Sequence, residues 1–134
     1  MINNIRKPVV LVADDDPDIR DIVQISLETK GIEVRTASDG IETLDAIGRC
    51  EFDLLVLDVD MPGLNGYSVV QELRGNERTA TIPVILASGL MADSKRSESD
   101  WAKELGVERV FIKPFDVIRI VEAVETILSS RPEK

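Results

Sequence analysis

Several polar residues stand directly after apolar runs in this sequence, and their types suit chemistry on an anionic group. Carboxylates occur at Asp14, Asp15 and Asp58, a hydroxyl at Ser88 and an ammonium group at Lys113. Carboxylate oxygens are ligands that Mg²⁺ prefers, and the absence of histidine disfavours zinc or iron. A carboxylate can also attack phosphorus to form an acyl phosphate, for which positioning and charge neutralisation matter most. These residue types predict Mg²⁺ beside a nucleophilic Asp58, with Lys113 and Ser88 contacting phosphoryl oxygens.

The elements that position these residues follow from an alternation of apolar runs with helical patterns. Strands are expected at residues 9–13, 33–38, 54–57, 84–87 and 109–112. Helices are expected after Asp16-Pro17, after Asp39-Gly40, over 67–74, over 92–105 and from Asp116. This alternation is typical of a parallel sheet covered by helices on both faces, so we predict a three-layer, doubly wound α/β fold.

Two finer expectations concern the second strand–helix unit. Residues 33–38 are shorter and more polar than the other apolar runs, so this strand is expected at the edge of the sheet. In the helix that follows, the spacing of Ile41, Leu44 and Ile47 predicts that these three side chains face the core.

The polar residues should meet at one edge of this sheet. Asp14 and Asp15 follow the first strand, Asp58 the third, Ser88 the fourth and Lys113 the fifth. Open α/β sheets bind ligands at the carboxyl ends of their strands, which in parallel strands lie on the same side. The order of the elements therefore predicts that residues far apart in the chain form one site.

Length and composition restrict the class of protein. The 134 residues fit a single domain, expected over 1–134 with its core at about 9–128, and 43% hydrophobic residues suffice for a core. A net charge of −9 argues against nucleic-acid or anionic membrane partners, because phosphates are bound by basic surfaces. The single cysteine, Cys50, excludes an internal disulfide, and no apolar run has the length of a membrane span. A cytoplasmic location is expected, since the first residues also lack an apolar signal sequence.

Four stretches resemble the receiver domains of bacterial response regulators, the CheY-like family. They read VADDDP, LLVLDVDMPGLNG, PVILAS and FIKPF, and the resemblance extends from about Val9 to Leu128. It implies the flavodoxin-like (βα)5 fold with strand order 2-1-3-4-5. It also implies a cis peptide bond between Lys113 and Pro114.

The same resemblance implies roles for the residues of the site. Asp58 corresponds to the phosphoacceptor, Ser88 to the switch hydroxyl and Lys113 to the family's lysine. Asp14 and Asp15 correspond to the acidic pair that holds Mg²⁺ together with Asp58, with Asp15 a direct ligand. The backbone carbonyl of Asp60 completes the expected set of metal ligands.

The implied function is that of a receiver in a two-component phosphorelay. The phosphoryl group is expected to come from a sensor histidine kinase or a histidine phosphotransfer protein, in a reaction that requires Mg²⁺. Phosphorylation is expected to alter partner binding through the face formed by the fourth and fifth strands and helices, as a monomer or a phosphorylation-dependent dimer. The domain would catalyse only its own phosphorylation and dephosphorylation. The sequence does not identify the cognate kinase or the downstream target.

Three features depart from the family pattern. Val110 stands where an aromatic residue is often found, so a ring that swings inward is missing. The segment between Ser88 and Lys113 is longer than is usual, which bears on partner choice. Asp60 adds a carboxylate beside the acceptor, and it is expected either to tune metal binding or acyl-phosphate hydrolysis, or to face solvent.

Two other functions are compatible with part of the pattern. Asp58-Val59-Asp60 after an apolar strand resembles the DxD motif of haloacid-dehalogenase phosphatases, although that motif normally follows the first strand. A phosphorylation-independent interaction module is the second alternative, and the complete set of acid, hydroxyl and lysine residues argues against it.

Overall fold

Five strands and five helices alternate along the chain in a computed structural model that describes residues 7–89 and 95–130. The strands are β1 (Val9–Ala13), β2 (Glu33–Ala37), β3 (Leu54–Asp58), β4 (Val84–Ser88) and β5 (Arg109–Ile112). The helices are α1 (Pro17–Glu28), α2 (Gly40–Arg49), α3 (Gly66–Arg74), α4 (Glu98–Leu105) and α5 (Val117–Ser130). All neighbouring strands are parallel and follow the order β2-β1-β3-β4-β5, which confirms the predicted fold class and strand order.

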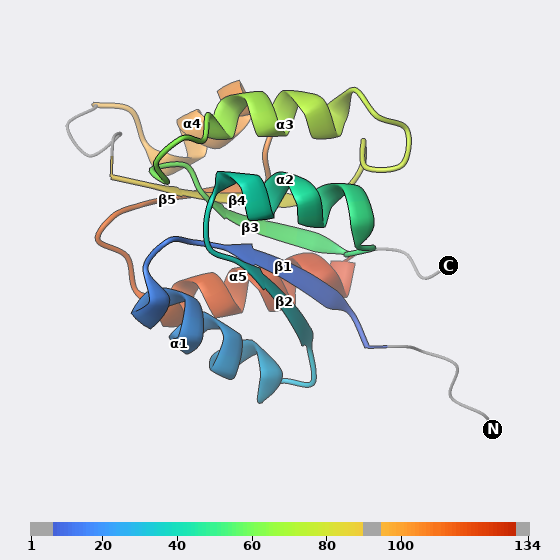
Figure 1. Ribbon diagram of the computed structural model, residues 1–134. Helices are drawn as coiled ribbons and strands as arrows, with labels where there is room; N and C mark the ends of the chain where they lie inside the picture. The colour runs from blue at the N-terminus through green and yellow to red at the C-terminus, as the bar shows by residue number, and fades with distance from the viewer. Residues whose placement is uncertain (1–6, 90–94, 131–134) are drawn as a thin grey trace.

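The sheet is the middle of three layers, with α1 and α5 on one face and α2, α3 and α4 on the other (Figure 1). Every residue of β1, β3 and β4 is buried, as expected for strands covered on both faces. Strand β2 lies at the edge, as predicted, and Glu33, Arg35 and Thr36 are exposed there. Within the two described stretches, none of the helices has both the length and the apolar character needed to cross a membrane.

Helix boundaries follow the residues that can satisfy free backbone N–H groups. The Asp16 carboxylate accepts hydrogen bonds from the backbone N–H groups of Asp18 and Ile19, so this acid caps α1, with proline at its first position. Helix α4 was predicted over residues 92–105, but it begins only at Glu98. Its start is set by a reciprocal capping box between Ser97 and Asp100. Residues 92–94 of the predicted helix lie outside the described part of the chain.

The prediction for the inner face of α2 was wrong for two of its three residues. Ile41 is 82% exposed and Leu44 is 44% exposed, whereas Ile47 is buried. The buried face instead combines Ile47 with Gly40 and Thr43, whose hydroxyl donates to the Asp39 carbonyl oxygen at 2.7 Å. A hydroxyl group that donates to a backbone carbonyl nearby in the chain can be buried at little cost. The apolar pattern of the sequence therefore did not identify the side of α2 that contains Thr43.

The parallel register brings the polar strand ends to one edge of the sheet. Ala13 lies beside Leu57, and Asp58 lies beside Ala87. Ser88 lies beside Ile112, so that Lys113 follows at the same level. The predicted convergence of distant residues is therefore a direct result of in-register pairing between strands that run in the same direction.

Close packing of Gly66 against the loop after β3 generates a stability prediction. A Cβ atom on Gly66 would lie 2.3 Å from Val59 Cγ1 and 2.7 Å from Val59 Cβ, which requires the loop to move. We expect Gly66→Ala to lower the free energy of unfolding by about 1–3 kcal/mol in a urea titration, through overpacking.

The matched control is Gly48→Ala, in the last turn of α2, where a Cβ would meet no atom within 4 Å. Because alanine favours the helix over glycine, this variant should raise the free energy of unfolding by roughly 0.5–1 kcal/mol. Similar effects of the two substitutions would contradict the packing argument.

Candidate functional site

Three carboxylates meet at the carboxyl edge of the sheet. One oxygen from each of Asp14, Asp15 and Asp58 lies within 4.8 Å of the others. Asp14 and Asp58 are buried, with 5% and 1% of their surface exposed, while Asp15 is exposed. Like charges at this separation in a partly buried place repel one another and favour a bound cation.

The Asp14 side chain is fixed by the turn into α1. Its Oδ1 atom accepts a hydrogen bond from the backbone N–H of Asp16 at 2.9 Å. Arg20 donates to the backbone carbonyl oxygen of Asp14 at 2.8 Å, so that helix α1 holds the end of β1. Burial, together with the nearby Asp58 charge, raises the pKa of Asp14 from 3.8 to about 6.

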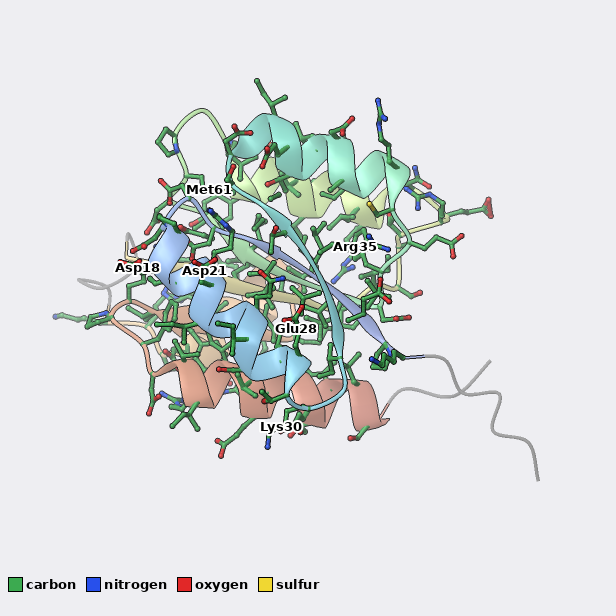
Figure 2. The ribbon with its side chains drawn as sticks, turned by 60° about the horizontal axis from the view of Figure 1, so that its bottom comes forward. Asp18, Asp21, Glu28, Lys30, Arg35 and Met61 are labelled. Atoms are coloured by element: carbon green, nitrogen blue, oxygen red, sulfur yellow. The ribbon has the colours of Figure 1, made fainter. Side chains whose placement is uncertain are left out.

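The acidic residues farther along α1 do not join the site. Figure 2 shows Asp18 and Asp21 along this helix, both exposed, and Met61 in the loop after β3. Asp16 caps the helix instead of binding in the cluster. The candidate metal ligands are thus restricted to Asp14, Asp15 and Asp58 among the described carboxylates.

Lys113 reaches into the site from the end of β5. Its Nζ atom lies 3.0 Å from Asp58 Oδ1 and 3.5 Å from Asp60 Oδ2. Although partial burial acts in the opposite direction, the hydrogen bond to Asp58 and the surrounding carboxylates raise the pKa of Lys113 above its ordinary value. The lysine therefore stays charged, and the predicted cis Lys113–Pro114 bond is present.

The two oxygens of the Asp58 carboxylate differ in their contacts with the part of the chain that the structure describes. Oδ1 accepts from Lys113 and, at 2.9 Å, from the backbone N–H of Asp60. Oδ2 is buried and accepts no hydrogen bond from the described residues. A buried anionic oxygen without a donor is unfavourable, and a cation beside Asp14 and Asp15 would satisfy it. The donor set, all carboxylate oxygen, fits Mg²⁺.

One of the two expectations for the Asp60 side chain was that it simply faces solvent, and this expectation was wrong. Its Oδ1 atom accepts from the Ser88 hydroxyl at 3.1 Å, and its Oδ2 atom accepts from the Gly89 backbone N–H at 2.7 Å. The carboxylate thus lies among the donors at the ends of β4 and β5. The role of the Asp60 backbone carbonyl as a metal ligand stays a prediction.

The structure brings together all of the side chains predicted for the site, and it adds contacts that the sequence did not reveal. Arg20 and the backbone N–H of Gly89 belong to the site through their contacts with Asp14 and Asp60. Glu98, on α4, accepts from the backbone N–H of Ile112 at 2.9 Å, next to Lys113. No sequence signal distinguished Arg20 or Glu98, and an acid such as Glu98 in the first turn of a helix is common.

On the face formed by α4, β5 and α5, Val110 occupies the position where the family often has an aromatic residue. Val110 is fully buried in the core beneath α4, while Phe111 packs on the opposite face of the sheet. Arg109 and Arg119 lie over the Phe111 ring at 4.7 and 5.3 Å. Trp101, on α4, is partly buried and packs against the core.

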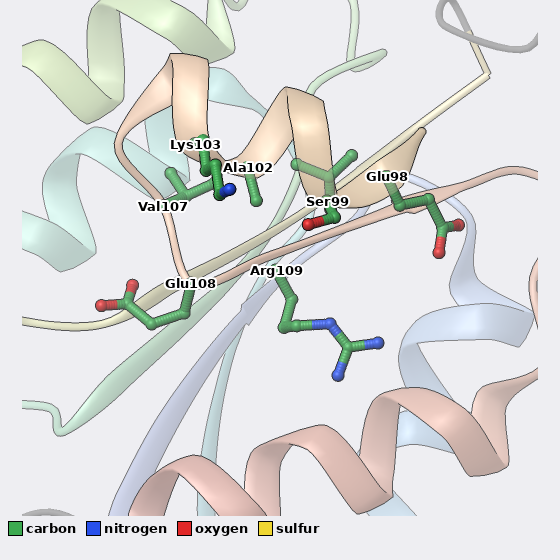
Figure 3. Close-up of a pocket in the computed structure, with 8 residues that line it drawn as sticks. Glu98, Ser99, Ala102, Lys103, Val107, Glu108 and Arg109 are labelled. Atoms are coloured by element: carbon green, nitrogen blue, oxygen red, sulfur yellow. The ribbon is translucent and has the colours of Figure 1, made fainter. Parts of the chain in front are cut away.

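A pocket between α4 and β5 lies apart from the carboxylate cluster. It is lined by Glu98, Ser99, Ala102, Lys103, Val107, Glu108, Arg109 and Val110. Figure 3 shows the Arg109 side chain leaving this pocket in the direction of α5. None of the cluster residues lines the pocket, so the pocket and the carboxylate cluster are separate features of the surface.

This fold and this site belong to a known class. A family model described as the response regulator receiver domain matches residues 10–125, and the chain is a member of that family, a signalling domain of two-component systems. Among solved structures, it is similar to the receiver domain of a Francisella response regulator, named 1452. The two share 32% identity and a TM-score of 0.79, over 92% of this chain and 98% of that one. The chemotaxis response regulator CheY4 of Vibrio cholerae matches with 26% identity and a TM-score of 0.77, over 90% of this chain and 98% of that one.

Curated relatives extend beyond this chain. The regulator RpaA of Synechocystis, described as a DNA-binding dual master transcriptional regulator, is 36% identical over 90% of this chain and 49% of its own length. The transcriptional regulatory protein PrrA of Mycobacterium tuberculosis is 34% identical over 98% of this chain and 54% of its own length. The chain thus spans about half the length of the curated relatives it matches.

Two expectations change in the light of these relatives. The absence of a nucleic-acid partner does not fit full-length relatives such as RpaA, whose description includes DNA binding. The phosphatase alternative loses its support, because the family match covers the chain and the Asp58-Val59-Asp60 stretch follows the third strand of a receiver fold.

The raised pKa of Asp14 gives a pH prediction for the metal-free protein. Protonation of Asp14 is favoured in the folded state, so its contribution to stability is complete below pH 3.8 and is lost as pH rises through about 6. In EDTA, the melting temperature of the natural protein should therefore fall between pH 5 and pH 7.5 relative to Asp14→Asn.

The two proteins are compared by thermal melts monitored by circular dichroism at each pH. Asp21→Asn, which removes an exposed charge from α1, controls for net charge and should follow the natural protein. An Asp14→Asn variant with the same pH dependence as the natural protein would show that Asp14 ionises normally.

Proposed function

We propose that Asp58 is the phosphoacceptor of this receiver domain. The observation that carries this proposal is the environment of its carboxylate at the end of β3. One oxygen is held by Lys113 at 3.0 Å, and the other is buried beside Asp14 and Asp15 without a donor among the described residues. The Asp58 carboxylate is thus held between the Lys113 ammonium group and two further carboxylates. In this position it is oriented to attack a phosphoryl group whose charge is neutralised by a metal cation.

The proposed reaction transfers a phosphoryl group from a phosphohistidine of a sensor kinase or phosphotransfer protein. An oxygen of Asp58 forms a bond to phosphorus while the phosphorus–nitrogen bond breaks, and the nitrogen keeps the electron pair. Lys113 neutralises charge on the phosphoryl oxygens, and Ser88 donates a hydrogen bond to one of them. Asp14, Asp15 and Asp58 would hold Mg²⁺, with the Asp60 carbonyl as a further ligand. The ion, when bound, supplies additional neutralisation of the phosphoryl charge.

We further propose that phosphorylation changes the surface formed by β4, α4, β5 and α5. The hydrogen bond from the Ile112 backbone N–H to Glu98 links α4 to β5, the strand that immediately precedes Lys113, and Arg119 on α5 lies 3.6 Å from the same glutamate. A shift at Lys113 can reach both helices through this contact. Because Val110 is a buried aliphatic side chain, the coupling does not depend on an aromatic ring at that position.

The proposed partners follow from this chemistry and from the relatives. We propose a single cytoplasmic signalling domain over residues 1–134, which is a monomer or a phosphorylation-dependent dimer. This domain catalyses only its own phosphorylation and dephosphorylation. The relatives RpaA and PrrA are described as transcriptional regulators, so transcription is the proposed output. With a net charge of −9, this domain would leave contact with DNA to another segment or another protein.

The central test is phosphorylation by a small donor. Incubation with acetyl phosphate and Mg²⁺ should add the mass of one phosphoryl group to the intact protein, and EDTA should abolish the gain. Asp58→Asn should show no gain, while Asp21→Asn should behave as the natural protein does. A gain that persists in Asp58→Asn would place the acceptor elsewhere, and no gain in any protein would favour a phosphorylation-independent module.

The role of Lys113 can be separated from metal binding. In Lys113→Met, the rate of phosphorylation at saturating Mg²⁺ should fall by about 10²-fold, because a charge positioned for the transferred group is lost. The affinity for Mg²⁺, measured by calorimetry, should stay the same or rise, since a neighbouring positive charge has been removed. A loss of Mg²⁺ affinity in this variant would mean that Lys113 instead maintains the structure of the site.

A further inference from the structure

The donors around Asp60 are the same groups that the proposed function assigns to a phosphoryl group. The Ser88 hydroxyl and the Gly89 backbone N–H each donate to one Asp60 oxygen, at 3.1 and 2.7 Å. Lys113 lies 3.5 Å from the second of these oxygens. A hydroxyl, a backbone N–H and an ammonium group thus surround a carboxylate that belongs to the protein itself.

The backbone around Asp60 fixes this carboxylate next to the acceptor. The Asp60 N–H donates to Asp58 Oδ1 at 2.9 Å, so the two side chains extend from one tight turn. Both Asp58 Oδ1 and Asp60 Oδ2 approach the same ammonium group of Lys113. An anion bound covalently at Asp58 would therefore compete with the Asp60 carboxylate for the same donors.

We propose that the Asp60 carboxylate is a resident competitor of the phosphoryl group. It occupies the hydroxyl, N–H and ammonium donors in the resting domain and must be displaced when Asp58 is phosphorylated. This inference rests on the proposed function of Asp58. It assigns to the Asp60 side chain a role in setting how readily the domain is phosphorylated, distinct from any role of its backbone carbonyl.

The geometry distinguishes this role from metal binding by the Asp60 side chain. The carboxylate oxygens that lie close enough to share one cation come from Asp14, Asp15 and Asp58, and the Asp60 side chain is not among them. Both Asp60 oxygens instead accept hydrogen bonds from β4 and the residue after it. A metal-binding role predicts that removing this carboxylate weakens anion binding in Mg²⁺, whereas competition predicts that removal strengthens it.

The test uses beryllium fluoride, whose complex with a carboxylate resembles an acyl phosphate. Natural protein, Asp60→Asn and Asp60→Ala are titrated at saturating Mg²⁺ and followed by amide NMR signals. Because a charge-assisted hydrogen bond is lost only from the free state, we expect half-saturation of Asp60→Ala at about tenfold lower concentration, with Asp60→Asn between the two. The initial rate of phosphorylation by acetyl phosphate should rise in the same order.

Asp18→Asn is the matched control, since it removes one exposed carboxylate from the start of α1, where Figure 2 places Asp18. It should leave both the titration and the rate unchanged. An equal gain in Asp18→Asn and Asp60→Asn would attribute the effect to net charge and overturn the proposal. Equal or weaker binding of beryllium fluoride by Asp60→Ala would overturn it as well.

A second readout does not depend on Asp58. In the free proteins, the Gly89 amide proton should move to higher field in Asp60→Ala, because its hydrogen bond to a charged oxygen is gone. An unchanged Gly89 signal would show that the contact is absent, and the competitor would then be rejected. If the Gly89 signal moves but no protein binds beryllium fluoride or gains a phosphoryl group, the proposed function fails, and the competitive role fails with it.

Discussion

Repulsion among carboxylates at the carboxyl edge of the sheet is the constraint on which the site depends. Asp14 and Asp58 are buried at the ends of two adjacent strands, so neither can move away from the other without disturbing β1 or β3. The apolar residues of these strands hold them in place, because sliding the register would expose the core. Two features result from this arrangement: the burial that raises the pKa of Asp14, and an Asp58 oxygen that has no donor within residues 7–89 and 95–130. A site that carries excess negative charge in a fixed geometry is suited to a cation and to chemistry that the cation assists.

The positive and neutral donors of the site are arranged around the same constraint. Lys113 contacts Asp58 and Asp60, while Ser88 and Gly89 contact Asp60 from the end of β4. Each of these donors therefore already has an anionic partner in the resting domain. Phosphorylation would exchange one anion for another at donors that are already positioned, so little reorganisation is needed at the moment of transfer. The Asp60 side chain would then determine how strongly these donors favour the resting domain over the phosphorylated domain.

The output side of the molecule is connected to the site through backbone and charge. Glu98 joins the start of α4 to the backbone of β5 and lies near Arg119 of α5, so three elements of this face meet at one carboxylate. Val110, by contrast, is packed in the core and has no ring that could change position. Under the proposed function, a change at Lys113 would be transmitted through the Glu98 contacts. The curated relatives RpaA and PrrA extend to about twice the length of this chain.

The sequence by itself determined the alternation of strands and helices, the edge position of β2 and the meeting of Asp14, Asp15, Asp58, Ser88 and Lys113. It could do so because parallel strands share one direction, so residues that follow apolar runs reach the same edge. Only the tertiary structure decided the buried face of α2, the start of α4 and the contacts of Arg20, Glu98 and Asp60. These features depend on which donor lies opposite a given side chain after the elements have packed. The local sequence does not indicate that pairing, because the same residue type can be exposed to solvent in one place and hydrogen-bonded within a site in another.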